Sequence, residues 1–349
     1  MAYCMAQFRN VYINNGKARP CCWYDRTELT NKVDNLVDVI DVFNSKEFEA
    51  IRNNPSKRPS GCWKCQMHED NGGKSHRHFW NEREVDDGIA KLTDLDIYMG
   101  NLCNLACVTC SSHNSSKWIA EEQKIFGTAQ KNTQDDIDIK LSWNLVKDLK
   151  RIKLAGGEVT IMPDHKKFLQ QLIDFDVAKN ITLVYIVNNT TDPTQFKDLF
   201  AQFKKVEFIL SIDGIGKVSD YVRYLSKWSE LEENINKTID IGISVSVNCV
   251  VSILNVYHLP ELVEWWKDRG HILFRLLDYP DHLSIKNLKS WQRELTIKKL
   301  QSYTEFDHII NALKELPEGN FDKFKQWITK VDKHRGNSYW KINEQFISS

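Results

Sequence analysis

The chain has 349 residues, 42% of them hydrophobic, and its 47 Lys and Arg balance 47 Asp and Glu, so the formal net charge is zero. This length suits one large α/β domain or two smaller ones, and the charge balance argues against a general attraction to nucleic acid or anionic membranes. The N-terminus, MAYCMAQFRN, has no apolar run after a basic start, and no apolar stretch approaches the roughly 20 residues of a membrane helix. We therefore expect a cytoplasmic protein with neither a nucleic-acid nor a membrane partner.

Eight of the nine cysteines lie within the first 110 residues, and only Cys249 lies beyond them. The reducing cytosol disfavours disulfides, so clustered cysteines indicate metal or redox chemistry. Residues 1–93 show little periodicity apart from a short strand at Val11–Ile13, a turn at Asn14–Gly16 and a helix at Ser45–Arg52. They contain five of the cysteines: Cys4, Cys21, Cys22, Cys62 and Cys65. We predict a small Cys-rich N-terminal domain over residues 1–93, which a metal site would help to order.

From Leu95 onward, apolar runs that favour strands alternate with helical patterns. The predicted strands are Leu95–Met99, Ile152–Ala155, Ile181–Val187, Val206–Ile212, Ile243–Val251 and Ile272–Leu277. The predicted helices are Ser112–Phe126, Asp164–Asp174, Thr194–Phe203, Trp228–Ile239 and Leu259–Arg269. This alternation predicts a parallel sheet with helical crossovers, and continuous apolar strands favour a sheet buried on both faces.

Six such units fit either a partial (β/α)6 barrel or a doubly wound sheet, over residues 94–280. In both folds the functional loops follow the carboxyl ends of the strands. Residues 281–349 are polar and predicted to form a helical C-terminal extension, with a break at Pro317-Glu318-Gly319.

Three cysteines, Cys103, Cys107 and Cys110, follow the first strand of this region with the spacing C-x3-C-x2-C. Three thiolates on one loop can hold three irons of a cubane cluster and leave the fourth iron without a protein ligand. That open iron could chelate the amino and carboxylate groups of a methionine-type ligand. The spacing alone leaves a second interpretation open, a structural zinc site with three cysteines and a nearby histidine such as His113.

Three further strand ends carry small or polar groups that a ligand can use. Gly156, Gly157 and Glu158 end the second strand, where glycines admit a ligand to the backbone and a carboxylate accepts bonds from an ammonium group. Asn188 and Asn189 end the third strand and could bond ribose hydroxyls, and Ser211 and Asp213 end the fourth, where they could contact a carboxylate or a ribose. Each segment alone is a common turn signal. A zinc site explains the cysteines only, so the joint occurrence favours a cofactor site.

Residues 94–278 resemble the radical S-adenosylmethionine (SAM) enzyme family. Cys103, Cys107 and Cys110 match its C-x3-C-x2-C motif, and Gly156-Gly157-Glu158 resembles the glycine-rich motif that binds the methionine amino group. Asn188-Asn189 resembles the ribose-contacting end of the third strand, and Ser211-Ile212-Asp213-Gly214 is similar to a segment common in the branch with auxiliary clusters. Two positions depart from the pattern: Thr109 stands where an aromatic is usual, and Val159 where a proline is usual.

The N-terminal region resembles the auxiliary-cluster "twitch" domain, a shortened relative of the SPASM domain. The matching segments are Cys4, Gly16–Cys22, Asn44–Lys46, Gly61–Cys65 and Glu69–Arg77, with Asp332–Gly336 near the C-terminal end. This resemblance implies that Cys4, Cys21, Cys62 and Cys65 hold a second [4Fe-4S] cluster. Cys22 competes with Cys21 for that role, and a zinc site with four cysteine ligands is the alternative.

The resemblance also implies the chemistry. A [4Fe-4S] cluster would reductively cleave SAM to methionine and a 5′-deoxyadenosyl radical, which would abstract hydrogen from a substrate. A one-electron reductant such as flavodoxin or ferredoxin would be the redox partner. Relatives with auxiliary clusters often modify peptides or proteins, so that is the expected substrate class, and a small molecule such as a sugar or nucleoside is the alternative.

Asp278, just past the sixth predicted strand, is a candidate acid/base residue, with loop capping as its other interpretation. Outside the enzymes, the alternative function is a non-catalytic zinc-binding module.

Overall fold

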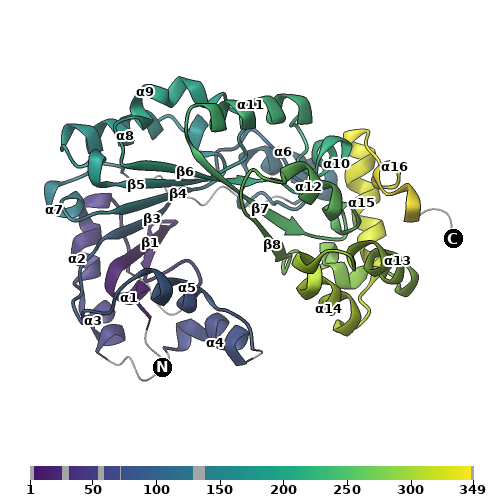
Figure 1. The fold of residues 1–349 in the computed structure, drawn as a ribbon, viewed down its shortest axis with the longest axis horizontal. Helices are drawn as coiled ribbons and strands as arrows, with labels where there is room; N and C mark the ends of the chain where they lie inside the picture. The colour runs from purple at the N-terminus through teal and green to yellow at the C-terminus, as the bar shows by residue number, and fades with distance from the viewer. Residues whose placement is uncertain (1–3, 26–30, 54–58, 71, 129–137, 347–349) are drawn as a thin grey trace. The chain divides into compact units, whose positions relative to one another are not determined.

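The computed structural model describes residues 4–25, 31–53, 59–70, 72–128 and 138–346. Asn71, within the run Glu69–Arg77, lies outside them. Eight strands form a mostly parallel sheet in the order β2-β1-β3-β4-β5-β6-β7-β8 (Figure 1). They are β1 Asn10–Asn14, β2 Lys17–Arg19, β3 Asp94–Tyr98, β4 Arg151–Ala155, β5 Thr182–Val187, β6 Lys205–Ser211, β7 Ser244–Val251 and β8 Ile272–Leu276. The six predicted strands correspond to β3–β8, with ends that differ by one residue at most.

The Cys-rich N-terminal segment adds two strands to this sheet that the six-strand prediction did not include. β1 pairs in parallel with β3, and β2 pairs antiparallel with β1. The predicted turn is confirmed: Asn15 and Gly16 both have positive φ, 53° and 60°, as a tight hairpin requires. The predicted boundaries at residues 93 and 280 stay a prediction.

The helices confirm most of the sequence-based expectations. In the N-terminal part they are α1 Ala6–Arg9, α2 Val39–Phe43, α3 Lys46–Arg52, α4 Trp63–Asp70 and α5 His76–Arg83. Between the later strands lie α6 Ser116–Phe126, α7 Trp143–Val146, α8 His165–Asp174, α9 Lys197–Phe200, α10 Gly216–Val222, α11 Trp228–Asp240 and α12 Leu259–Trp266. The C-terminal extension is helical as predicted, with α13 Ser290–Leu300, α14 Asp307–Glu315, α15 Phe321–Arg335 and α16 Tyr339–Ile342, and the predicted break separates α14 from α15.

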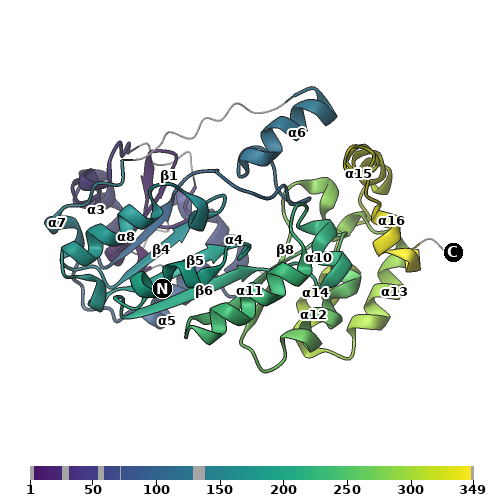
Figure 2. The same ribbon diagram turned by 90° about the horizontal axis from the view of Figure 1, so that it is seen from above.

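The chain divides into two compact units. Unit 1 comprises residues 1–102, 133–186 and 195–207, and unit 2 comprises residues 103–132, 187–194 and 208–349. In unit 1, α8 lies over one face of β4 and β5 (Figure 2). In unit 2, β7 and β8 pair in parallel, and α6 packs against α15.

One face of the sheet in unit 1 is polar. Tyr12, Asp96 and Lys153 lie side by side on β1, β3 and β4, and the Lys153 Nζ is 2.5 Å from the Asp96 carboxylate. The opposite face is apolar, with Leu95 and Ile152 buried. The composition of β3 and β4 suggested strands that are apolar on both faces. In the structure, β3 and β4 each have one polar face. Burial of the charged row is tolerated because each charge has a cross-strand partner.

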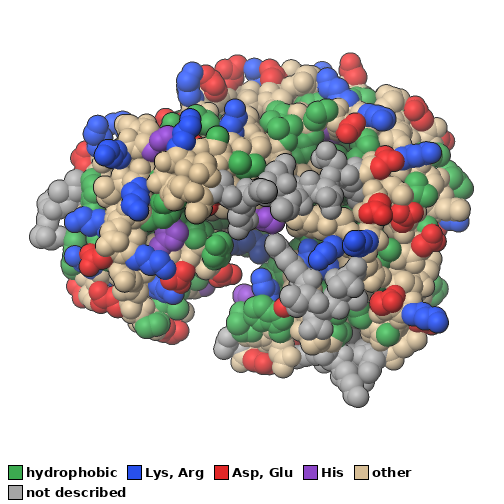
Figure 3. Space-filling view, turned by 180° about the vertical axis from the view of Figure 1, so that it is seen from behind, with side chains coloured by type: hydrophobic (Ala, Val, Ile, Leu, Met, Phe, Trp, Pro, Cys, Tyr) green, Lys and Arg blue, Asp and Glu red, His purple; other side chains and the backbone are tan. Residues whose placement is uncertain are grey.

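In the described part of the chain, no helix is both long and apolar enough to cross a bilayer. On the face shown in Figure 3, Lys and Arg side chains are interspersed with Asp and Glu side chains rather than gathered by sign.

Candidate functional site

The loop that follows β3 brings the three cysteines of the C-x3-C-x2-C motif together. Cys103 and Cys107 are buried in one packed cluster with Leu105, and Cys110 packs against it. The Cys110 amide donates to the Cys107 carbonyl at 2.9 Å, and the Leu105 amide lies 3.4 Å from the Cys103 Sγ. We call residues Cys103–Cys110 the triad loop.

Helix α6 fixes the backbone of the triad loop. Ser115, at the N-cap of α6, donates its hydroxyl to the Leu105 carbonyl at 2.6 Å. The indole of Trp118 donates to the Cys107 carbonyl at 2.7 Å. These bonds satisfy buried carbonyl groups of the loop and hold its thiols in place before any metal binds.

The C-terminal extension reaches the triad loop through Arg335, at the end of α15. The Arg335 guanidinium donates to the Ala106 carbonyl at 2.8 Å and pairs with the Glu121 carboxylate at 2.5 Å. It lies between the rings of Trp118 and Tyr224, 4.5 and 4.2 Å from their centroids. Sequence reasoning missed this role, because nothing along the chain links residue 335 to residue 106.

A second arginine, Arg223, lies next to a triad thiol. Its Nε donates to Asp213 Oδ2 at 3.0 Å, and its Nη1 lies 3.6 Å from the Cys107 Sγ. The other carboxylate oxygen of Asp213 accepts the Val250 amide at 2.8 Å. Asp213, predicted to contact the cofactor, is thus placed as the counter-ion of Arg223.

Burial dominates the electrostatics of two of the triad thiols, Cys107 and Cys110. It raises the pKa of Cys107 above its ordinary value, with Arg223 acting in the opposite direction, and it raises the pKa of Cys110 to about 12. Without metal these thiols are protonated at neutral pH. Metal loading therefore releases protons and is favoured by the nearby guanidinium charge.

The Gly156-Gly157-Glu158 segment packs against the backbone just before the triad loop. The Glu158 amide donates to the Leu102 carbonyl at 2.8 Å, and a Cβ on Gly157 would collide with that carbonyl. The Glu158 side chain is fully buried and accepts bonds from the Thr160 amide and hydroxyl at 3.2 and 2.6 Å. Only glycine fits this close backbone contact, which ends at the residue preceding Cys103.

The two asparagines after β5 have different surroundings. The Asn188 amide donates to the Asn104 side chain at 3.0 Å and lies 4.0 Å from the Cys103 Sγ. Asn189 has a positive φ of 57° and donates to the Thr238 hydroxyl at 3.2 Å. Asn188 therefore lies beside the triad loop, whereas the Asn189 side chain bonds to α11.

The two remaining predicted residues lie at strand ends. Ser211 is the last residue of β6 and is half-buried, and Asp278 lies exposed in the loop after β8. Their predicted roles stay predictions.

In unit 1, the four cysteines predicted for the auxiliary site line one pocket. Cys4, Cys21, Cys62 and Cys65 share it with Gln7, His76 and Arg77. Burial raises the pKa of Cys4 to about 12 and that of Cys62 to about 11, and the positive charge of Arg77 lowers both. We call this the four-cysteine pocket.

Cys22 does not line this pocket. Its electrostatic influence falls on the adjacent Cys21 thiol, and also on Tyr12 and Lys153 on the polar face of the sheet. Of these two adjacent cysteines, Cys21 lines the four-cysteine pocket and Cys22 does not.

Each set consists of cysteine thiols, the usual ligands of iron–sulfur clusters. Among the described residues, no three His, Cys, Asp or Glu side chains converge as a single metal ion would need. A cubane binds each thiolate through a different iron, so its ligands surround a volume rather than one point. Three thiolates would leave one iron of a cubane open, and four would occupy all of its irons.

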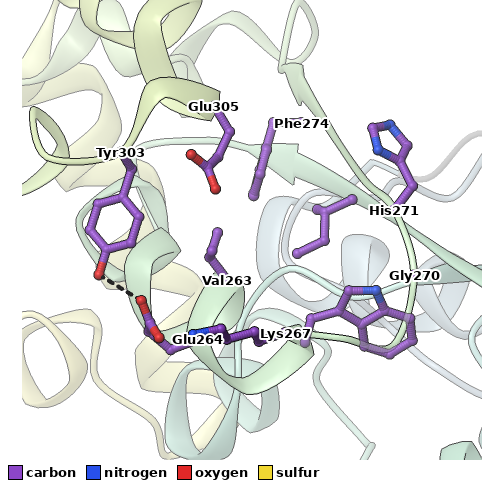
Figure 4. A pocket seen from close by; sticks show the side chains of 10 residues that line it. Val263, Glu264, Lys267, Gly270, His271, Phe274, Tyr303 and Glu305 are labelled. Carbon is purple, nitrogen blue, oxygen red and sulfur yellow. Dashed lines mark hydrogen bonds between the residues drawn. The ribbon is translucent and has the colours of Figure 1, made fainter.

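A further pocket of unit 2, of about 440 Å³, lies between α12, β8 and Tyr303 (Figure 4). Tyr303 donates its hydroxyl to the Glu264 carboxylate at 3.2 Å across its rim. None of the predicted site residues lines this pocket.

Comparison with known proteins finds similarity to one superfamily. The model of the radical SAM superfamily matches residues 97–265. A GTP 3′,8-cyclase of Sulfurimonas denitrificans is 21% identical over 219 residues, which cover 61% of this chain and 64% of the relative. A probable GTP 3′,8-cyclase of Methanocaldococcus jannaschii is 24% identical over 192 residues, covering 52% and 58%. The chain thus spans less than two thirds of the length of these curated relatives.

Solved structures show distant likeness. The enzyme anSMEcpe with bound AdoMet has a TM-score of 0.43 and 17% identity, covering 63% of this chain and 62% of its own. Streptococcus suis SuiB bound to S-adenosylmethionine has a TM-score of 0.38 and 13% identity, covering 74% and 49%.

Proposed function

Because this chain is a radical SAM superfamily enzyme, we propose that it holds two [4Fe-4S] clusters and uses SAM to modify a peptide or protein. The observation that carries the two-cluster proposal is the four-cysteine pocket, where cysteines from residues 4 to 65 of the sequence meet. The family assignment sets aside the alternative of a non-catalytic zinc module.

The triad thiols Cys103, Cys107 and Cys110 would hold the SAM-binding cluster. When bound, that cluster supplies the electron that cleaves SAM into methionine and a 5′-deoxyadenosyl radical. An external one-electron donor of the flavodoxin or ferredoxin class would restore the electron.

The other predicted residues would bind SAM around that cluster. Gly156 and Gly157 would serve by allowing the close backbone contact with Gly100 and Leu102, and the buried Glu158 carboxylate would accept the ammonium group of the methionine part. Asn188, which lies beside Cys103, would contact the ribose. The carbon-centred radical requires a dry site, and the burial of Cys103, Cys107 and Glu158 favours one.

A peptide substrate is supported by the resemblance to the branch with auxiliary clusters and by one feature of unit 2. Among the described residues, β8 pairs with β7 only, so its outer edge offers backbone N–H and C=O groups. An extended peptide can pair with such an edge as an added strand. Asp278 lies two residues past the end of β8 and would act as acid or base there.

A nucleotide substrate is the second candidate, and the curated relatives favour it. Both are named as GTP 3′,8-cyclases. In that case the same SAM chemistry would act on a small molecule.

Formation of 5′-deoxyadenosine in the presence of different substrates distinguishes the two. The reconstituted enzyme is incubated with SAM and titanium(III) citrate, and an extract of the source cells or GTP is added. We expect the extract to stimulate 5′-deoxyadenosine formation. Treating the extract with protease beforehand should abolish this stimulation, whereas treating it with phosphatase, the control, should not. Stimulation by GTP alone, or by an extract resistant to protease, would contradict the peptide proposal.

A further inference from the structure

Arg223 carries a buried positive charge, and its guanidinium is held in one orientation. Its side chain is 11% exposed, and its counter-ion Asp213 is 1% exposed. Burial by itself lowers the pKa of Arg223, but Asp213 and the triad sulfurs together raise it. The guanidinium is therefore charged at every pH at which the protein is folded.

The Asp213 carboxylate orients this charge toward the triad loop. One oxygen holds the Arg223 Nε and the other is held by the Val250 amide. The Asp213 backbone carbonyl also accepts a hydrogen bond from the Asn255 side chain at 2.7 Å. Hydrogen bonds therefore hold both the side chain and the backbone of Asp213. With Nε occupied, Nη1 is left to approach the Cys107 Sγ at 3.6 Å.

We propose that Arg223 is a positioning residue that raises the reduction potential of the triad cluster, by placing a fixed positive charge and an N–H donor beside the Cys107 sulfur. Three thiolates make the bound cluster anionic, and accepting one electron adds another negative charge. A nearby cation stabilises the reduced form more than the oxidised form, and hydrogen bonds to cluster sulfurs act in the same direction. This role depends on the family chemistry and on neither the substrate nor the auxiliary cluster.

The test is a redox titration of the reconstituted full-length protein with titanium(III) citrate, followed by electron paramagnetic resonance. The triad cluster is identified as the signal that changes when SAM is added, so a second cluster does not obscure it. We expect Arg223→Gln to lower its midpoint potential by at least 59 mV, which is a tenfold fall in the ratio of reduced to oxidised cluster at a given poise.

Two variants separate charge from packing. Arg223→Lys keeps the positive charge, so we expect the midpoint potential of its triad cluster to fall by less than half of the fall in Arg223→Gln. Arg293→Gln removes another buried arginine of unit 2, one that bonds to the Leu313 and Leu316 carbonyls, and is expected to leave the potential unchanged. Iron content and circular dichroism report whether each variant is folded and loaded.

Three results would overturn the proposal. The first is an Arg223→Gln variant that is loaded with cluster and has the same midpoint potential as the wild type. The second is an Arg293→Gln variant whose midpoint potential falls as much as that of Arg223→Gln. The third applies if Arg223→Gln holds no cluster. In that case, a fall of about 59 mV or more in the midpoint potential of Arg223→Lys would show that the positive charge is not what sets the potential. Loss of SAM cleavage without a change in potential would likewise overturn it.

Discussion

Cys21 and Cys22 are neighbours in the sequence, yet their thiols meet different surroundings. Cys21 lies in the four-cysteine pocket, and its burial, together with the neighbouring Cys22, Cys4 and Cys62 thiols, raises its pKa well above the ordinary value. Cys22 is half-buried near Tyr12 and Lys153. The turn after β2 thus directs one thiol into the four-cysteine pocket and the other toward the polar face of the sheet.

This difference gives a prediction at the level of single residues. Anaerobically reconstituted wild-type protein should contain about eight irons, four for each cubane. Cys21→Ala should contain about four, because the auxiliary cluster loses a ligand, whereas Cys22→Ala should keep about eight. Iron and sulfide analysis checks this, and equal iron loss in the two variants would contradict the assignment.

At the scale of elements, α15 is more than a C-terminal appendage. Its last residue, Arg335, bonds to the triad loop, and Asp332 accepts the Tyr221 hydroxyl of α10 at 2.8 Å. The helix therefore joins the loop that follows β3 to the helix that follows β6. A sequence pattern predicts that α15 is a helix, but not which loop its buried charge will contact.

Replacement of Arg335 should loosen the triad loop. Arg335→Ala leaves the Glu121 carboxylate and the Ala106 carbonyl without this donor, at a cost of about 3–5 kcal/mol for a broken buried pair. We expect a lower thermal midpoint and faster loss of triad iron to a chelator. Lys333→Ala, at an exposed position of the same helix, is the matched control. If both variants lose iron at the wild-type rate, α15 does not support the site.

At the scale of the whole molecule, the sequence predicted β3–β8 well because hydrophobic runs and helical periodicity are local signals. It also predicted that Cys103, Cys107 and Cys110 come together, since they share one loop. It missed β1 as a member of the sheet because the pairing of β1 with β3 spans some 80 residues, and β2 joins the sheet only through its hairpin with β1. For the same reason it missed Arg223 and Arg335, whose contacts with the triad loop depend on tertiary packing.

The polar row of Asp96 and Lys153 shows a second limit. Composition suggested strands that are apolar on both faces, but the charges of neighbouring strands compensate one another across the sheet. Such compensation depends on strand order and register, which a single sequence does not reveal. The role expected for Asp213 changed for a similar reason, since its partner Arg223 lies ten residues further along, just past the end of α10.

The central claim is that the triad loop cleaves SAM, and the most direct measurement is 5′-deoxyadenosine formed by the reconstituted protein with SAM and titanium(III) citrate. Wild-type protein and Cys249→Ala, which changes a buried core cysteine outside both sites, should form it. Cys107→Ala should form none, because its cluster lacks one of three ligands. Activity that survives in Cys107→Ala, or that is absent from loaded wild-type protein with the stimulating extract present, would contradict the account.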